Sequence, residues 1–225
     1  IICDGIVSGS KVWYEYQQIN RKLDFDNEYI VYPNVSLGCN FALSSGCVID
    51  MTGFIIPSND LYLLAVLNSS LIQYLMKKMA ITRRGGYQEF KVQYLEKVPI
   101  KDLNAAEKGP FVTLVREAIR HASELDQVVS AVGHLLRSKY TLPTLSRALE
   151  NWPSLEFKGF LAELKKAKVS LSLAEEAEWL SYFTAQKAKA QALQAQIEKT
   201  DAAIDALVYQ LYGLTEEEIK VVEGS

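Results

Sequence analysis

The sequence contains few of the residues that build metal sites or disulfide frameworks. Its 225 residues include three cysteines, Cys3, Cys39 and Cys47, and two histidines, His121 and His134. The number of cysteines is odd, their spacing matches no metal-binding pattern, and both histidines lie far along the chain. We therefore expect partly buried free thiols, surface histidines, no disulfide and no metal centre, in a reducing, cytoplasmic environment.

Long apolar runs are also missing. The longest is Leu61 to Leu67, which is far too short to span a bilayer, so we expect no membrane partner. No charged-then-apolar leader opens the chain, and Ile1-Ile2-Cys3 resembles a strand already under way, so we interpret the sequence as part of a longer protein. With 49% apolar residues, the chain can bury a core and fold as a globular protein.

The sequence also lacks the usual signatures of a catalytic centre. It has no phosphate-cradling glycine loop and no dinucleotide fingerprint. The segment Gly5-Ile6-Val7-Ser8-Gly9 has Val where a nucleophile elbow needs Ser. Glu89 and Lys91 form a Glu-x-Lys pair like that of some nucleases, without a convincing upstream Asp. We therefore expect no catalytic residues and no bound cofactor in this chain.

Positive charge is concentrated in one short segment. The net charge is −3, but residues 77–91 carry Lys77, Lys78, Arg83, Arg84 and Lys91 against Glu89 alone. The paired glycines Gly85-Gly86 predict a loop there. Arginine can read guanine, glutamine can read adenine, and both Lys and Arg bind phosphates, so this segment has the residues needed to contact a duplex. The alternative is a solvated basic loop after an amphipathic helix.

The residue pattern divides the chain into two parts. Residues 1–103 alternate short β-rich runs (29–32, 41–43, 47–51 and 54–56) with two apolar helices, near 61–67 and 71–79. Residues 104–225 are dominated by two heptad stripes, which predict long helices at about 105–138 and 173–212, with short helices between them in 142–169 and a short terminal helix. The predicted fold is α+β, with a mixed α/β domain followed by two long, antiparallel, coiled-coil-like helices.

Several motifs in the same order resemble a known DNA-recognition module. They are Ile30-Val31-Tyr32-Pro33-Asn34-Val35-Ser36, Asp60 to Ser69 with its Leu-Asn-Ser ending, Arg84-Gly85-Gly86-Tyr87, and Tyr94-Leu95-Glu96-Lys97-Val98-Pro99-Ile100. Their order and spacing are similar to the TaqI-like carboxy-terminal specificity domain of adenine-specific DNA methyltransferases. Residues 200–219 resemble the ending of the same large restriction–modification enzymes.

This resemblance implies that the chain binds double-stranded DNA and selects the target sequence. The methyltransferase domain of the parent protein would bind S-adenosylmethionine and methylate a flipped adenine. The candidate DNA contacts, implied to lie in the loops of residues 30–93, are first Arg83, Arg84, Tyr87, Gln88 and Lys91, then Asn34, Ser36 and Asn40, with Lys77 and Lys78 as phosphate contacts.

Two other functions fit the sequence. The chain could be a separate specificity subunit, or half of one, whose long helices act as a spacer and docking surface for methylase subunits. It could also be a helical protein–protein scaffold without DNA binding. The residues upstream of Ile1 would distinguish the fused enzyme from the separate subunit.

Overall fold

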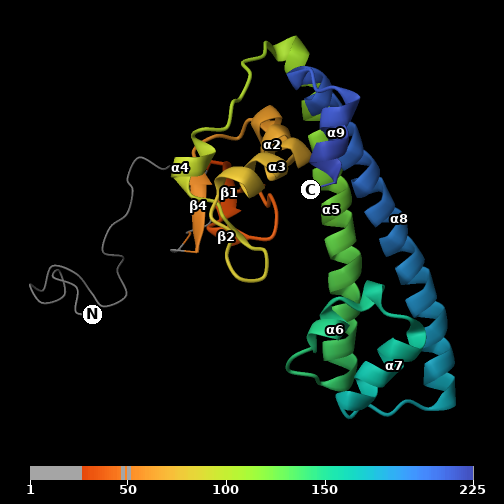
Figure 1. Ribbon diagram of the computed structural model, residues 1–225. Coiled ribbons are helices and arrows are strands. Elements are labelled where there is room, and N and C mark those ends of the chain that lie inside the picture. The colour runs from red at the N-terminus through yellow and green to blue at the C-terminus, as the bar shows by residue number, and fades with distance from the viewer. Residues whose placement is uncertain (1–26, 47–48, 50–51, 225) are drawn as a thin grey trace, which may run out of the picture.

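The computed structural model describes residues 27–46, 49 and 52–224. It confirms the α+β fold class, with small antiparallel sheets followed by long helices (Figure 1). The elements in chain order are β1 (Tyr29–Pro33), β2 (Val35–Ser36), β3 (Ala42–Ser44), β4 (Gly53–Ile56), α2 (Leu61–Asn68), α3 (Ser70–Met79), β5 (Gln88–Glu89), α4 (Val92–Leu95), α5 (Ala105–Tyr140), α6 (Arg147–Glu150), a 3-10 turn (Trp152–Ser154), α7 (Phe157–Lys166), α8 (Leu173–Tyr212) and α9 (Glu216–Glu223).

The larger sheet is built around β1, which pairs antiparallel with β3 on one side and β4 on the other. Its β-branched and aromatic residues favour an extended backbone, and alternate residues, Ile30 and Tyr32, are buried. Pro33 ends the strand, where a missing backbone donor costs least. The strand expected at 47–51 falls almost entirely outside the described residues.

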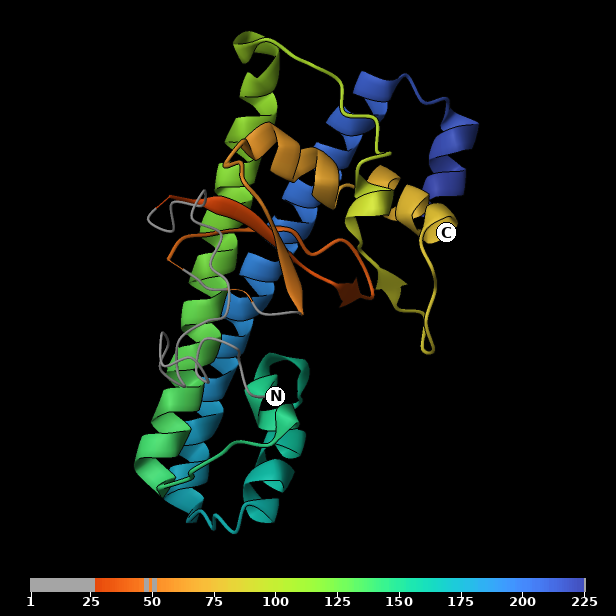
Figure 2. The same cartoon turned by 90° about the vertical axis from the view of Figure 1, so that its left-hand side faces the viewer.

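Helices α2 and α3 lie between this sheet and the long helices (Figures 1 and 2). Five of the eight residues of α2 are buried, as expected for a helix covered on several sides. The α2 helix begins after the N-cap Asp60, and α3 begins after Ser69, whose hydroxyl accepts from the Ile72 amide. The ring of Tyr62 packs edge-on against Phe111 of α5, with the centroids 5.2 Å apart.

The long helices α5 and α8 run antiparallel beside each other (Figure 1). Tyr140, at the end of α5, accepts a 2.7 Å hydrogen bond from the indole of Trp179, near the start of α8. Most of the residues in the heptad stripe predicted for α8 are buried. Near the end of the helix the buried residues are instead Val208 and Tyr209, because the α/β unit covers the face of α8 on which they lie. His121 of α5 was expected at the surface, and this prediction was wrong: it is 8% exposed, whereas His134 is exposed.

Two hydrophobic clusters occupy opposite ends of the helical pair. The first joins the sheet, α2 and α3 to the start of α5 and the end of α8, so the α/β unit and the base of the helices share one core. The second encloses Trp152, Phe160 and Phe183 under α6 and α7, which form a cap at the distal end (Figure 1). Trp152 and Phe160 are completely buried in this cap.

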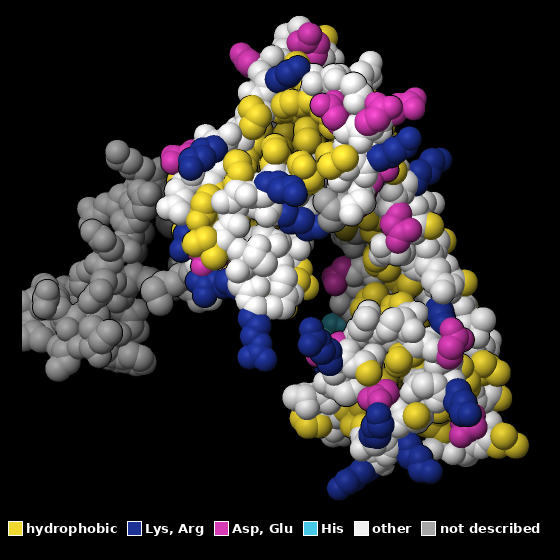
Figure 3. Space-filling model, in the orientation of Figure 1, with side chains coloured by type: hydrophobic (Ala, Val, Ile, Leu, Met, Phe, Trp, Pro, Cys, Tyr) yellow, Lys and Arg dark blue, Asp and Glu magenta, His cyan; other side chains and the backbone are white. Residues whose placement is uncertain are grey.

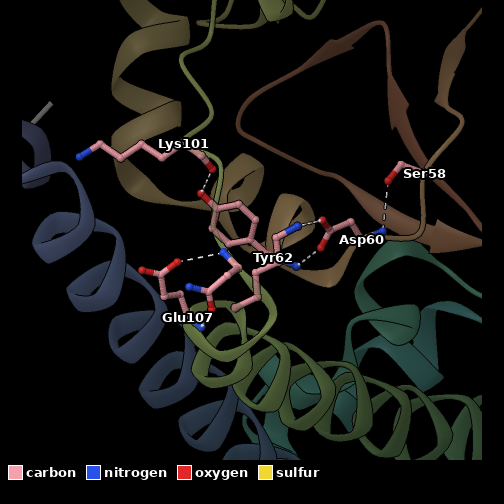
Figure 4. A network of polar contacts seen from close by, with 7 residues as sticks. Ser58, Asp60, Tyr62, Lys101 and Glu107 are labelled. Carbon is pink, nitrogen blue, oxygen red and sulfur yellow. Dashed lines mark hydrogen bonds and ion pairs between the residues drawn. The ribbon is translucent and has the colours of Figure 1, made fainter.

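Polar contacts lock the α/β unit to the helices. Asp60 caps α2 and pairs with Lys108 of α5 at 2.7 Å, while Tyr62 holds the connection to α5 by donating to the Lys101 carbonyl at 2.8 Å (Figure 4). On the other side, the carboxylate of Asp205 accepts from the backbone amide and hydroxyl of Ser70, at 2.8 and 2.6 Å. The two parts are thus fixed relative to each other.

Candidate nucleic-acid interface

The basic segment forms the predicted loop, shaped as a short hairpin that one β-bridge closes. Thr82 forms a bridge with Gln88, and the Arg83 amide donates to the Tyr87 carbonyl at 2.6 Å. Gly85 and Gly86 have φ values of +85° and +83°, in the left-handed region that favours glycine, which allows the chain to reverse there. The tip of the hairpin is exposed from Ile81 to Tyr87.

The base of this hairpin is fixed to the rest of the α/β unit. Strand β5 pairs antiparallel with β2, with Ser36 opposite Gln88, and the Phe90 amide donates to the Asn34 carbonyl at 2.8 Å. Phe90 is 2% exposed and contributes to the main core. The hairpin therefore projects from a rigid support, as Figure 2 shows for the loop that follows α3.

A buried carboxylate holds two of the expected DNA-contacting cations. Glu89 is 2% exposed; its Oε1 accepts from Arg83 Nε at 2.6 Å, and its Oε2 lies 2.6 Å from Lys91 Nζ. These contacts, with Lys91 the larger influence, hold the pKa of Glu89 below its ordinary value although desolvation acts the other way. The trio keeps a net charge of +1, and the Arg83 and Lys91 side chains remain 58% and 44% exposed.

The outward-facing groups of the hairpin are Arg84 and Tyr87. Both are exposed, Tyr87 to 42%, and within the described part of the chain Arg84 forms no ion pair. Lys78, in the last turn of α3, is exposed and its ammonium lies 5.3 Å from the centre of the Tyr74 ring. Lys77, one residue earlier, is half-buried.

The second group of predicted residues lies beside the hairpin, on and after β2. Ser36 and Gln88 are both 6% exposed, so their side chains belong to the base of the interface rather than to its outer surface. Asn40 is exposed and donates to the Ser36 hydroxyl. The Asn34 side-chain oxygen is buried and accepts no hydrogen bond from any described residue. The β2–β5 pairing brings these residues close to the hairpin.

Exposed apolar side chains surround the hairpin, and the sequence reasoning missed them. Leu37 is 56% exposed, Ile81 54% and Val92 56%. Apolar side chains are the kind of group that contacts the methyl group of thymine in protein–DNA complexes. The alternation of Val35, Ser36 and Leu37 did not signal this, because the apolar residues of such a pattern are ordinarily the buried ones, whereas here the serine is buried between two exposed apolar residues.

Two family models match different parts of the chain. Residues 6–100 match the family model of the TaqI-like C-terminal specificity domain, which confirms the resemblance seen in the motifs of the first hundred residues. Residues 104–208 match a model described only as a domain of unknown function (DUF8810). No curated protein matches the chain. In the described residues, no helix is long and apolar enough to cross a membrane.

Proposed function

We propose, from the match of residues 6–100 to the TaqI-like specificity domain, that this chain reads the target sequence of a restriction–modification type II adenine DNA methyltransferase. In this proposal, residues 1–103 form the recognition domain and residues 104–225 a helical domain. The partners are double-stranded DNA and the methyltransferase domain of the parent protein. That catalytic domain, rather than this chain, would hold S-adenosylmethionine.

The observation that carries the proposal is the exposed hairpin on a rigid base. A two-stranded β-ribbon fits the major groove of B-DNA, where each base pair presents a distinct set of donors and acceptors. Because Gln88 and Phe90 anchor the base of the hairpin, its tip can enter a groove without first being ordered. We therefore assign different roles to the exposed residues of the tip and to the buried residues of the base.

We assign base reading to Arg84 and Tyr87, at the exposed tip. Arg84 can donate two hydrogen bonds to guanine, because no ion pair with another described residue competes for its guanidinium. Arg83 and Lys91, half-neutralised by Glu89, suit contacts to the phosphate backbone, as do Lys77 and Lys78. Gln88 and Ser36 shape the base of the hairpin, while Asn34 and Asn40 lie at its edge.

The charge distribution predicts weak binding by this chain alone. Residues 1–108 carry eleven basic and eleven acidic residues, and Glu89 reduces the local excess further. Since phosphate neutralisation supplies most of the affinity of non-specific DNA binding, the catalytic domain of the parent would provide much of it.

A separate specificity subunit is the second candidate, and the helical pair favours it. From Asp205, which contacts the α/β unit, to Trp179, in the distal cap, α8 spans about 40 Å at 1.5 Å per residue. A rigid spacer of that length suits a protein that docks onto methylase subunits.

The test is to select duplexes from a random pool with the wild-type chain at low salt, and then to measure binding of the Arg84→Ala and Tyr87→Ala variants. Arg84→Ala should cost about 1–3 kcal/mol on the selected sequence and relax preference at one base pair. Arg116→Ala, an exposed arginine of α5, is the matched control and should leave that preference unchanged.

Unchanged sequence preference in both hairpin variants would refute the assignment of base reading to the hairpin. If the wild-type chain enriched no sequence and the parent protein methylated no defined sequence, the scaffold function would gain support. Sequencing modified adenines made by the parent protein, with and without Arg84→Ala, would show whether the chosen sequence directs methylation.

A further inference from the structure

The distal cap of the helical pair carries a second concentration of positive charge. Residues 137–169 contain seven basic and three acidic residues, whereas residues 170–225 contain four basic and ten acidic residues. Figure 3 shows Lys and Arg side chains gathered at this end of the molecule, separated by open space from those below the α/β unit. The net negative charge of the helical half therefore does not reveal that its distal end is basic.

Three lysines of the cap surround one hollow of about 520 Å³. Lys158 and Lys165 are seven residues apart on α7, which places them on the same face of the helix, and Lys168 follows the end of α7. All three are exposed, and within the described ranges none forms an ion pair. Glu176 is the one acidic residue among those that line the hollow.

The backbone of Lys168 allows its charge to be removed by a substitution that suits its conformation. Its φ is +63°, in the left-handed conformation that ends α7, with its amide donating to Lys165 and the Val169 amide donating to Leu164. Glycine is the residue that this helix-ending position favours. Replacing Lys168 by glycine would therefore remove the ammonium group without straining the backbone.

The cap is firmly packed on the distal part of α8. Phe160 of α7 packs against Trp179 and Phe183 of α8, with ring centroids 5.5 and 4.9 Å apart. The cap is thus rigidly attached about 40 Å along α8 from the contact of Asp205 with the α/β unit. The hairpin projects from the α/β unit toward this end of the helical pair (Figures 1 and 2), so a duplex that lies on the hairpin can also reach the cap.

We propose that Lys158, Lys165 and Lys168 form a second DNA contact, which binds the phosphates flanking the target sequence without reading bases. This inference rests on the proposed function for the identity of the duplex. Lysine is suited to the role because its compact ammonium binds phosphate as a point charge. The cap increases affinity and fixes the position of the protein, while the hairpin supplies sequence preference.

The test measures the salt dependence of binding by the full chain to two duplexes. One contains the selected sequence within about one helical turn, and the other extends it by about two turns on each side. The variant Lys158→Gln/Lys165→Gln/Lys168→Gly is compared with Lys189→Gln/Lys199→Gln/Lys220→Gln, which removes the same charge from exposed positions of α8 and α9. Lys168→Gly is also measured alone, because glycine suits its backbone conformation.

On the long duplex, the cap variant should lower the slope of log K against log salt by about 0.9 per lysine and weaken binding at least ~10-fold at low salt. The sequence preference and the affinity for the short duplex should not change. Lys168→Gly should show a slope loss of about 0.9 with an equal or higher melting temperature, which separates lost contact from lost folding.

Equal salt slopes for the cap variant and the control on the long duplex would overturn the inference, whatever the hairpin does. A wild-type chain with no sequence preference, but with a slope that depends on the cap lysines, would instead reject the proposed function and keep the cap as a backbone contact. Absence of binding to either duplex at low salt would reject both.

Discussion

Phe160→Ala should unfold the distal cap while leaving the recognition part intact. Phe160 is completely buried, and its ring centroid lies 4.9 Å from that of Phe183, 5.5 Å from Trp179 and 6.2 Å from Phe157. Burying such a side chain contributes about 1.5–3 kcal/mol, and each aromatic pair adds roughly 0.5–1.5 kcal/mol. With the cavity left behind, we expect a loss of about 3–5 kcal/mol.

Hydrogen exchange measured peptide by peptide can locate this loss. Since a tenfold change in an equilibrium corresponds to about 1.4 kcal/mol, amides of α6, α7 and the start of α8 should exchange roughly a hundred to several thousand times faster. Amides of α2 and α3 should keep their protection, because these helices belong to the other hydrophobic cluster. Phe160→Leu, which retains much of the volume, should cost only about 1–1.5 kcal/mol. Equal acceleration in both clusters would refute the reasoning, because it would mean that the chain unfolds as one cooperative unit.

Two further predictions concern the hairpin and the junction of the two parts. The pKa of Glu89 is lower in the folded state than its ordinary value of 4.5. Its ion pairs therefore stabilise the hairpin fully at pH values above 4.5, and this stabilisation is lost as the pH falls through the lowered pKa. Exchange protection of the hairpin should therefore fall in acid, and Glu89→Gln should remove most of this dependence; a pH-independent wild-type hairpin would contradict it. Asp205→Ala should cost about 1–3 kcal/mol in urea unfolding, because Ser70 loses both acceptors, with Asp205→Asn between it and wild type. A change below about 0.5 kcal/mol in the alanine variant would show that this contact does not fix the α/β unit.

Several features were predictable because they depend on neighbours close in the sequence. Apolar residues at every third or fourth position predict the α5 and α8 helices, and the capping box of Ser172 and Glu175 predicts the start of α8. The paired glycines of the hairpin likewise predict a reversal of the chain, since few other residues adopt positive φ. The ordered motifs of the first hundred residues also sufficed to predict the resemblance to the specificity domain whose family model matches residues 6–100.

The roles within the candidate site depended on contacts between distant residues. Whether Gln88 faces solvent or the base of the hairpin is decided by its pairing with Ser36, 52 positions earlier in the chain. Asn68 and Ser69 of the Leu-Asn-Ser motif are both residue types that cap helices, and Ser69 caps α3. Asn68, however, pairs through its amide with the backbone of Phe41, at 3.0 and 2.9 Å. His121 is buried because of how α5 packs, which its own neighbours in the sequence do not reveal.

The sequence by itself determined the α+β class, the two long helices and the location of the basic segment, because periodicity, caps and charge are local properties. Only the folded structure shows which cations of the basic segment are paired: Glu89 holds Arg83 and Lys91, while Arg84 is exposed and forms no ion pair with a described residue. It also brings Lys158, Lys165 and Lys168 around one hollow. The physical reason is that burial, ion pairing and distance are set by segments that meet only when the chain is folded.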